Sequence, residues 1–221
     1  MPPQIVPTPR VLPAVMTALA ILWLFSGPSL RAQMEHHHHD MPMPANAAVP
    51  QPEGRIAIPD VSVLDQDGRP VRFYSDLVRG QVVAVNFIFT TCTTVCPPMG
   101  VNFARLQKLL TARAAAGGGA APARLISVSV DPTTDTPERL KAWAEKFGRG
   151  PGWTLVTGPK ADVDRLLRTL QAYTPSYNDH SPLILVGNDA TGVWQRMNGL
   201  APPAEIARLI DRVAGPATVK K

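Results

Sequence analysis

Residues 81–89 (QVVAVNFIF) constrain the fold of this 221-residue chain more than any other segment. Apart from Gln81 and Asn86, every residue of the run is apolar, and most are β-branched or aromatic. A dense run without alternation between apolar and polar positions is typical of a strand that is covered on both faces. The run therefore predicts a sheet with a packed layer on each side, as in α/β proteins.

Strands and helices alternate along the predicted domain. Besides 81–89, the expected strands are 61–64, 71–73, 124–130, 183–186 and 193–197. The expected helices, where apolar residues repeat at helical spacing, lie near 97–113, 140–147, 163–170 and 206–213. A β-α-β unit followed by a β-hairpin and a closing helix predicts an α/β protein with a thioredoxin-like fold. The turn sequence at 65–68 (DQDG) joins the first two strands into an added N-terminal β-hairpin.

The N-terminal residues 1–32 are typical of an export signal. Arg10 precedes an apolar run at 11–25, and the small residue Ala32 offers a cleavage point. The run is shorter than the roughly 20 residues that a membrane-spanning helix needs, but Leu30 is larger than the residue preferred near a cleavage site. A cleaved signal peptide and a retained N-terminal membrane anchor both remain open. Either predicts a domain in the periplasm, free or anchored to the inner membrane.

Three further segments follow this signal. Residues 33–55 predict a flexible linker rich in His, Met and Pro, residues 56–215 the thioredoxin-like domain, and residues 216–221 a disordered tail. The net charge of +5 is small, and the basic residues form no stripe. The charge therefore indicates no nucleic-acid partner.

The only two cysteines, Cys92 and Cys96, follow the 81–89 strand at the start of the next helix. Helix N-terminal N–H groups favour a thiolate, the form of cysteine that binds metal. Residues four apart on a helix hold their Cβ atoms roughly 5–6 Å apart, whereas a relaxed disulfide needs about 4 Å. The spacing favours one soft metal ion between the two sulfurs, while a plain disulfide or a redox-active pair stays open.

His180 is the one histidine outside the linker, and it precedes the 183–186 strand. In a thioredoxin-like fold the loop entering this strand lies beside the cysteine helix, so the imidazole can reach both sulfurs. Two thiolates and an imidazole suit Cu(I) and, with a further oxygen ligand, Cu(II). Zinc is the competing metal, but structural zinc usually takes four protein ligands, and no fourth is evident.

Three motifs occur in order: Phe89-Thr90-x-Cys92-x-x-x-Cys96-Pro97, Ser129-Val130-Asp131-Pro132-x-x-Asp135-Thr136-Pro137 and Asp179-His180-Ser181. Together they resemble the Sco/SenC copper proteins, over about 58–213. The resemblance implies a thioredoxin fold with Cys92, Cys96 and His180 as copper ligands. It also implies delivery of copper to the CuA-type centre of cytochrome c oxidase. The implied partners are the oxidase subunit that carries this centre and an upstream copper donor.

The motifs contain three acidic residues, two of which have more than one interpretation. Asp131 ends its strand at the sheet edge of the cysteines, where it could tune a copper site or form a turn with the following proline. Asp179 could orient His180 or occupy a turn. Asp135 complements the start of the following helix, whose N-cap is Thr136, and is expected to be structural.

Pro182 departs from the family pattern, because it follows Ser181 directly at the entry to the 183–186 strand. A proline at this entry is a thioredoxin feature and is often cis. The sequence therefore raises the hypothesis of a cis Ser181–Pro182 peptide bond.

The linker contains a cluster of soft donors at 34–43 (MEHHHHDMPM). Its thioether and imidazole groups belong to Met34, His36, His37, His38, His39, Met41 and Met43. Such a composition could bind copper weakly before transfer to a tighter site. A purification tag is the alternative, but the run is internal and follows an intact signal segment. The tract therefore predicts auxiliary copper capture.

These features support one leading function and two alternatives. The leading function is an exported copper metallochaperone without catalytic turnover. The second is a thiol-disulfide oxidoreductase, with Cys92 and Cys96 as its redox-active pair, that acts on cysteines of the copper-receiving partner. The third is a peroxidase-like thiol enzyme, which needs an arginine beside its cysteine, and the motifs assign none there.

Overall fold

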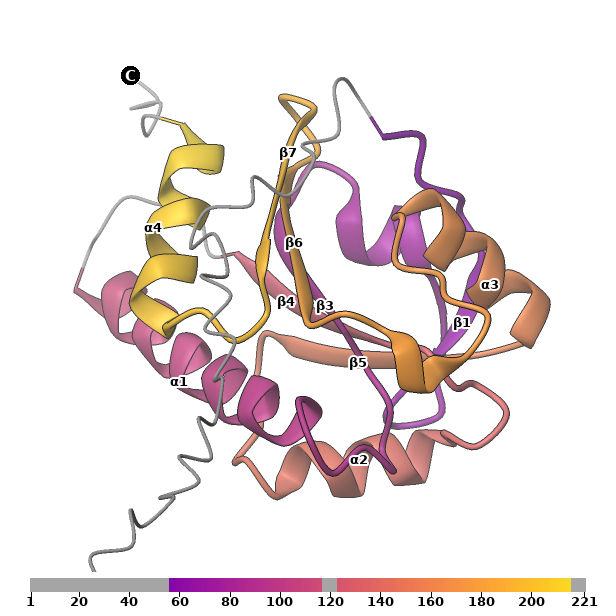
Figure 1. Cartoon of the computed structure of the whole chain (residues 1–221). Coiled ribbons are helices and arrows are strands. Elements are labelled where there is room, and N and C mark those ends of the chain that lie inside the picture. The colour runs from indigo at the N-terminus through magenta and orange to yellow at the C-terminus, as the bar shows by residue number, and fades with distance from the viewer. Residues whose placement is uncertain (1–55, 117–122, 216–221) are drawn as a thin grey trace, which may run out of the picture. The chain divides into compact units, whose positions relative to one another are not determined.

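The computed structural model describes residues 56–116 and 123–215 (Figure 1). The predicted export signal, the linker with its His/Met tract and the C-terminal tail lie outside the described residues. Within the described ranges, no helix is both long and apolar enough to cross a membrane.

One mixed sheet, with strand order β2-β1-β5-β4-β3-β6-β7, forms the centre of the domain. Its strands are β1 (Ser62–Asp65), β2 (Pro70–Arg72), β3 (Val82–Ile88), β4 (Arg124–Ser129), β5 (Trp153–Thr157), β6 (Leu183–Asn188) and β7 (Val193–Asn198). Strand β3 pairs parallel with β4 and antiparallel with β6, so the strand that leads into the cysteine motif lies inside the sheet. Strands β1 and β2 pair antiparallel, with Ser62 opposite Arg72.

Helices cover both faces of this sheet, as the 81–89 run predicts. They are α1 (Cys96–Ala115), α2 (Pro137–Glu145), α3 (Lys160–Thr169) and α4 (Pro203–Ala214), with two short helical turns, η1 (Phe73–Val78) and η2 (Tyr177–Asp179). Side chains of β3 alternate between two cores. Ala84 and Ile88 pack in the core shared with α1, α2 and α4, and Val85 and Phe87 in the core shared with α3 and η1. Figure 1 shows α1 and α4 side by side on one side of the sheet.

One strand, β5, is missing from the elements expected from the sequence. Its partners are distant along the chain: Leu125 of β4 lies opposite Trp153, and Leu64 of β1 lies opposite Thr157. Because strand preference depends strongly on such cross-strand neighbours, the five-residue segment WTLVT indicates little by itself. The additional strand separates the β1–β2 hairpin from β4, which places the hairpin at the sheet edge away from the cysteine motif.

Candidate metal centre

The loop at 89–95 connects the buried strand β3 to α1 and carries Cys92. Cys96 is the first residue of α1, one residue before the predicted start near 97, and Pro97 and Pro98 follow in the first turn. Cys92, which the sequence also predicts at the helix start, lies in the preceding loop, so helical spacing does not relate the two cysteines. Proline is tolerated there because the first N–H groups of a helix have no partner within it. The N–H of Cys96 instead donates to Sγ of Cys92 at 3.4 Å. The helix start thus holds the two cysteines together.

The two cysteines are free thiols in different environments. Cys92 is 8% exposed, whereas Cys96 is fully buried. Burial works to raise the pKa of Cys92, but hydrogen bonds with Cys96 and Thr94 outweigh it and lower that pKa below its ordinary value. Burial raises the pKa of Cys96 well above its ordinary value, and the hydrogen bond to Cys92 adds to the rise. Cys92 is therefore the sulfur that favours the thiolate form.

His180 follows η2 and directs its ring toward the cysteines. Its Nε2 lies 3.9 Å from Sγ of Cys96, and its Nδ1 lies 3.0 Å from the carbonyl oxygen of Tyr177. A carbonyl oxygen can only accept, so this contact favours the tautomer with the proton on Nδ1, in which Nε2 presents a lone pair. Burial lowers the pKa of His180, and the Phe89 ring packs edge-on against the imidazole at 5.4 Å between centroids. Burial thus favours the neutral form of the ring, and the contacts with Tyr177 and Phe89 orient it.

The spacing of these atoms fits a shared metal ion. A metal about 2.3 Å from sulfur and about 2.0 Å from imidazole nitrogen holds the two atoms roughly 3.5–4.3 Å apart, for angles from tetrahedral to linear. The 3.9 Å between Cys96 Sγ and His180 Nε2 falls in this range. In the described part of the chain, no group of three His, Cys, Asp or Glu side chains lies close enough together to hold a metal ion.

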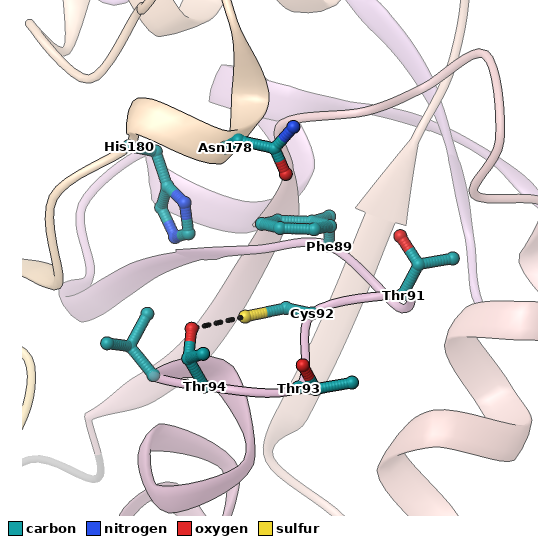
Figure 2. A pocket seen from close by; sticks show the side chains of 8 residues that line it. Phe89, Thr91, Cys92, Thr93, Thr94, Asn178 and His180 are labelled. Atoms are coloured by element: carbon teal, nitrogen blue, oxygen red, sulfur yellow. Dashed lines mark hydrogen bonds between the residues drawn. The ribbon is translucent and has the colours of Figure 1, made fainter.

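A pocket with a volume of about 340 Å³ opens over Cys92 (Figure 2). It is lined by Phe89, Thr91, Cys92, Thr93, Thr94, Val95, Asn178 and His180. Figure 2 shows the Cys92 sulfur and the His180 ring pointing toward the same space. The lining contains no arginine, which a peroxidase-like cysteine would need. The pocket gives an incoming ion or ligand a route to Cys92.

The described hydrogen bonds connect neither Asp131 nor Asp179 to the sulfurs or the imidazole. The Asp131 carboxylate accepts from the hydroxyl of Thr133 at 2.6 Å and lines a separate cavity. Asp179 is exposed, and the carbonyl of Tyr177 accepts from His180. These contacts favour the turn interpretation for both aspartates.

Three residues to which the motifs assign no ligand role lie close to the site. Asp135 is buried and accepts hydrogen bonds from the N–H and hydroxyl of Thr90, just before the cysteines. Phe89 packs against His180 and also against Tyr177, 5.0 Å away between centroids. Thr90 and Asp135 are 45 residues apart and meet because the parallel neighbours β3 and β4 end at the same sheet edge. The β-α-β order is the signal that could have indicated this contact.

The hypothesis of a cis Ser181–Pro182 bond is wrong, because the described residues contain no cis peptide bond. The chain leaves His180 in an extended conformation and continues into β6. The carbonyl of Pro182 accepts the N–H of Gly199 at 2.9 Å. An extended entry needs no tight turn of the kind that cis proline makes.

A family model described as SCO1/SenC matches residues 51–215, which include the whole described domain. Among curated proteins, the SCO1 protein homolog of Bacillus subtilis (strain 168) is 39% identical over 95 residues, 42% of this chain and 45% of that protein. A protein of Stutzerimonas stutzeri named "Putative copper-binding protein" is 28% identical over 114 residues, 52% of each. The chain spans about half the length of these curated relatives.

Among solved structures, BsSco, in which a disulfide switch was identified, is a member of the Sco family of cytochrome c oxidase assembly proteins. It is 27% identical, with a TM-score of 0.60, and the match covers 77% of this chain and 98% of that chain. This likeness confirms the predicted thioredoxin-like α/β fold. Since the family model covers most of its length and the three motifs lie within the match, this chain belongs to the SCO1/SenC family.

Proposed function

We propose that this protein binds copper through Cys92, Cys96 and His180 and delivers it to the CuA-type centre of cytochrome c oxidase. One observation carries the proposal: Nε2 of His180 lies 3.9 Å from Cys96 Sγ, and the Cys96 N–H donates to Cys92 Sγ. Two sulfurs and an imidazole suit Cu(I), and an added oxygen ligand suits Cu(II). Membership of the SCO1/SenC family, which includes a cytochrome c oxidase assembly protein, supports the same assignment.

The site suits a metallochaperone, because a partner protein could reach a bound copper ion through the pocket over Cys92. Cys92 lines the open pocket, whereas Cys96 lies buried beside His180. An acceptor ligand that enters the pocket can replace Cys92 first, while Cys96 and His180 still hold the ion. The proposed partners are the oxidase subunit that carries the copper centre and an upstream copper donor.

We place this domain in the periplasm, free or anchored to the inner membrane. The support is the export-like composition of residues 1–32, with Arg10 before an apolar run and Ala32 at its end.

A thiol-disulfide oxidoreductase that acts on the copper-receiving partner is the second candidate. The unequal cysteines favour it: the pKa of Cys92, which reaches the pocket, is lowered by hydrogen bonds that outweigh its burial, and Cys96 lies buried next to it. The Cys92 thiolate would attack a partner disulfide and release one partner thiolate. Cys96 would then attack the mixed disulfide, which leaves a Cys92–Cys96 disulfide and a reduced partner.

An anaerobic copper titration with a parallel disulfide-reduction assay tests the two functions. For a metallochaperone, we expect one copper per domain, a thiolate-to-copper charge-transfer band in the Cu(II) form, and insulin reduction at the background rate. An oxidoreductase would reduce insulin equally well in the wild type and in His180→Ala. A wild type that binds clearly less than one copper per domain would contradict the metallochaperone proposal.

For the 34–43 tract, which lies outside the described residues, we propose weak auxiliary copper capture. Replacing residues 34–43 with a Gly/Ser linker of equal length should lower copper loading several-fold when copper is limiting, because thioether and imidazole donors are lost. The affinity of the core site should not change. Copper per protein after brief exposure to substoichiometric copper measures the effect, and unchanged loading would refute the proposed role.

A further inference from the structure

The carboxylate of Asp135 points away from the helix that it precedes. The N-cap of α2 is Thr136, whose hydroxyl accepts the N–H of Arg139. Asp135 is 1% exposed, and its Oδ1 accepts the N–H of Thr90 at 3.1 Å and the Thr90 hydroxyl at 2.5 Å. Its Oδ2 accepts the hydroxyl of Ser129 at 2.6 Å. The carboxylate therefore joins the end of β4 to the cysteine loop.

Thr90 occupies a tight turn that positions two parts of the metal site. The N–H of Cys92 donates to the carbonyl of Phe89 at 3.2 Å, so residues 89–92 form a turn with Thr90 as its second residue. The Cys92 sulfur lies at one end of this turn. The Phe89 ring, which packs against His180, lies at the other. A shift of Thr90 would therefore move the sulfur and the aromatic contact together.

We propose that Asp135 is a positioning residue for the metal site, because its carboxylate holds the 89–92 turn in the arrangement that brings Cys92 to Cys96 and Phe89 to His180. The inference rests on the proposed copper function. The geometry places Asp135 beside the site: its carboxylate contacts Thr90, two residues before Cys92.

The chain offers a matched control for this role. Asp60 accepts the N–H groups of Tyr74 and Ser75 at 3.1 and 2.9 Å and the Ser75 hydroxyl at 2.7 Å. Its hydrogen bonds resemble those of Asp135 but lie in the segment around η1, which carries no proposed ligand. Asp60→Ala therefore removes similar hydrogen bonds, together with an ion pair to Arg72 at 3.3 Å, without touching the cysteine loop.

Two measurements test the proposal. One is Cu(I) affinity by anaerobic competition with a chromogenic chelator. The other is the rate at which iodoacetamide alkylates Cys92 in the metal-free protein at pH 7, followed by mass spectrometry. The second needs no copper, so it reports on the turn even if the proposed function fails.

We expect Asp135→Ala to weaken Cu(I) affinity by about 10–100-fold, the range typical when a group that orients a metal ligand is removed. Alkylation of Cys92 should slow severalfold, because a loosened turn moves the Cys92 sulfur away from the Cys96 N–H, which stabilises the reactive thiolate. Asp135→Asn keeps an oxygen for Thr90 and can donate to Ser129, so it should recover most of both values. Asp60→Ala should lower the Tm and leave both values unchanged.

Wild-type affinity and alkylation in Asp135→Ala would overturn the proposal. So would an equal loss in Asp60→Ala, which would indicate general destabilisation. If Asp135→Asn is as impaired as Asp135→Ala, the negative charge of Asp135 matters and its hydrogen bonds do not. That result would also overturn the proposal. If Asp135→Ala does not fold, Thr90→Val decides: it removes the hydroxyl contact alone, and wild-type values there would refute the proposed role.

Discussion

Replacing His180 with alanine should weaken Cu(I) binding on the order of 100-fold or more, because loss of a direct ligand, the role we propose for His180, exceeds the 10–100-fold cost of losing an orienting group. The variant leaves two sulfurs, and Cys96 is fully buried with a raised pKa, mainly because of burial. Without the nearby imidazole, the two sulfurs alone must hold the ion, and the buried Cys96 does not favour the thiolate form. A loss of this size corresponds to about 2.7 kcal/mol or more of binding free energy.

The measurement should use a background in which residues 34–43 are replaced by a Gly/Ser linker, since the four histidines of that tract could mask the loss. His180→Cys is the matched control, because it restores a soft donor at the same place and should recover part of the affinity. Circular dichroism and the Tm of the metal-free proteins check folding. A folded His180→Ala protein that retains wild-type affinity would remove His180 from the ligand set.

Replacing Trp153 with alanine should destabilise the domain by about 3–5 kcal/mol, the usual cost of removing a large buried aromatic side chain. Trp153 is 1% exposed and packs edge-on against Phe103 of α1 at 5.8 Å and Trp143 of α2 at 6.4 Å between centroids. Its Nε1 donates to the buried hydroxyl of Ser127 at 2.9 Å. One side chain of β5 thus ties two helices to β4.

Urea denaturation of the metal-free proteins measures this effect. Trp153→Phe keeps most of the aromatic packing but leaves the Ser127 hydroxyl without its donor, so it should cost about 1–3 kcal/mol. Both variants should keep the wild-type Cu(I) affinity while folded, because Trp153 does not line the pocket over Cys92. A loss below about 1 kcal/mol for Trp153→Ala would show that the side chain is not a main support of this core.

Trp153 also belongs to β5, the one strand that the sequence did not predict. The buried run 81–89 predicts β3 well, because its composition alone requires cover on both faces. The WTLVT segment becomes a strand only because β4 and β1 pair with its two edges. Its dominant interactions are therefore tertiary, and no local pattern contains them.

The candidate site divides in the same way. The strand-loop-helix segment places Cys92 in the loop and Cys96 at the helix start, and the motif order indicated His180, whose Nε2 the structure brings to 3.9 Å from Sγ of Cys96. The interpretation of Asp135 as a helix-end residue missed its main contacts. Spacing along the chain cannot show which neighbouring loop a carboxylate faces.

The sequence by itself therefore determined every helix and strand of the expected order except β5, together with the identity of the soft donors, because these depend on local composition and on the chemistry of single side chains. Only the tertiary structure decided which groups surround those donors. The Tyr177 carbonyl that favours one tautomer of His180, the unequal burial of the two sulfurs and the Asp135 carboxylate beneath the loop all arise from folding. Contacts between distant segments form where strands end at one sheet edge, and their energies depend on burial that no single segment can set.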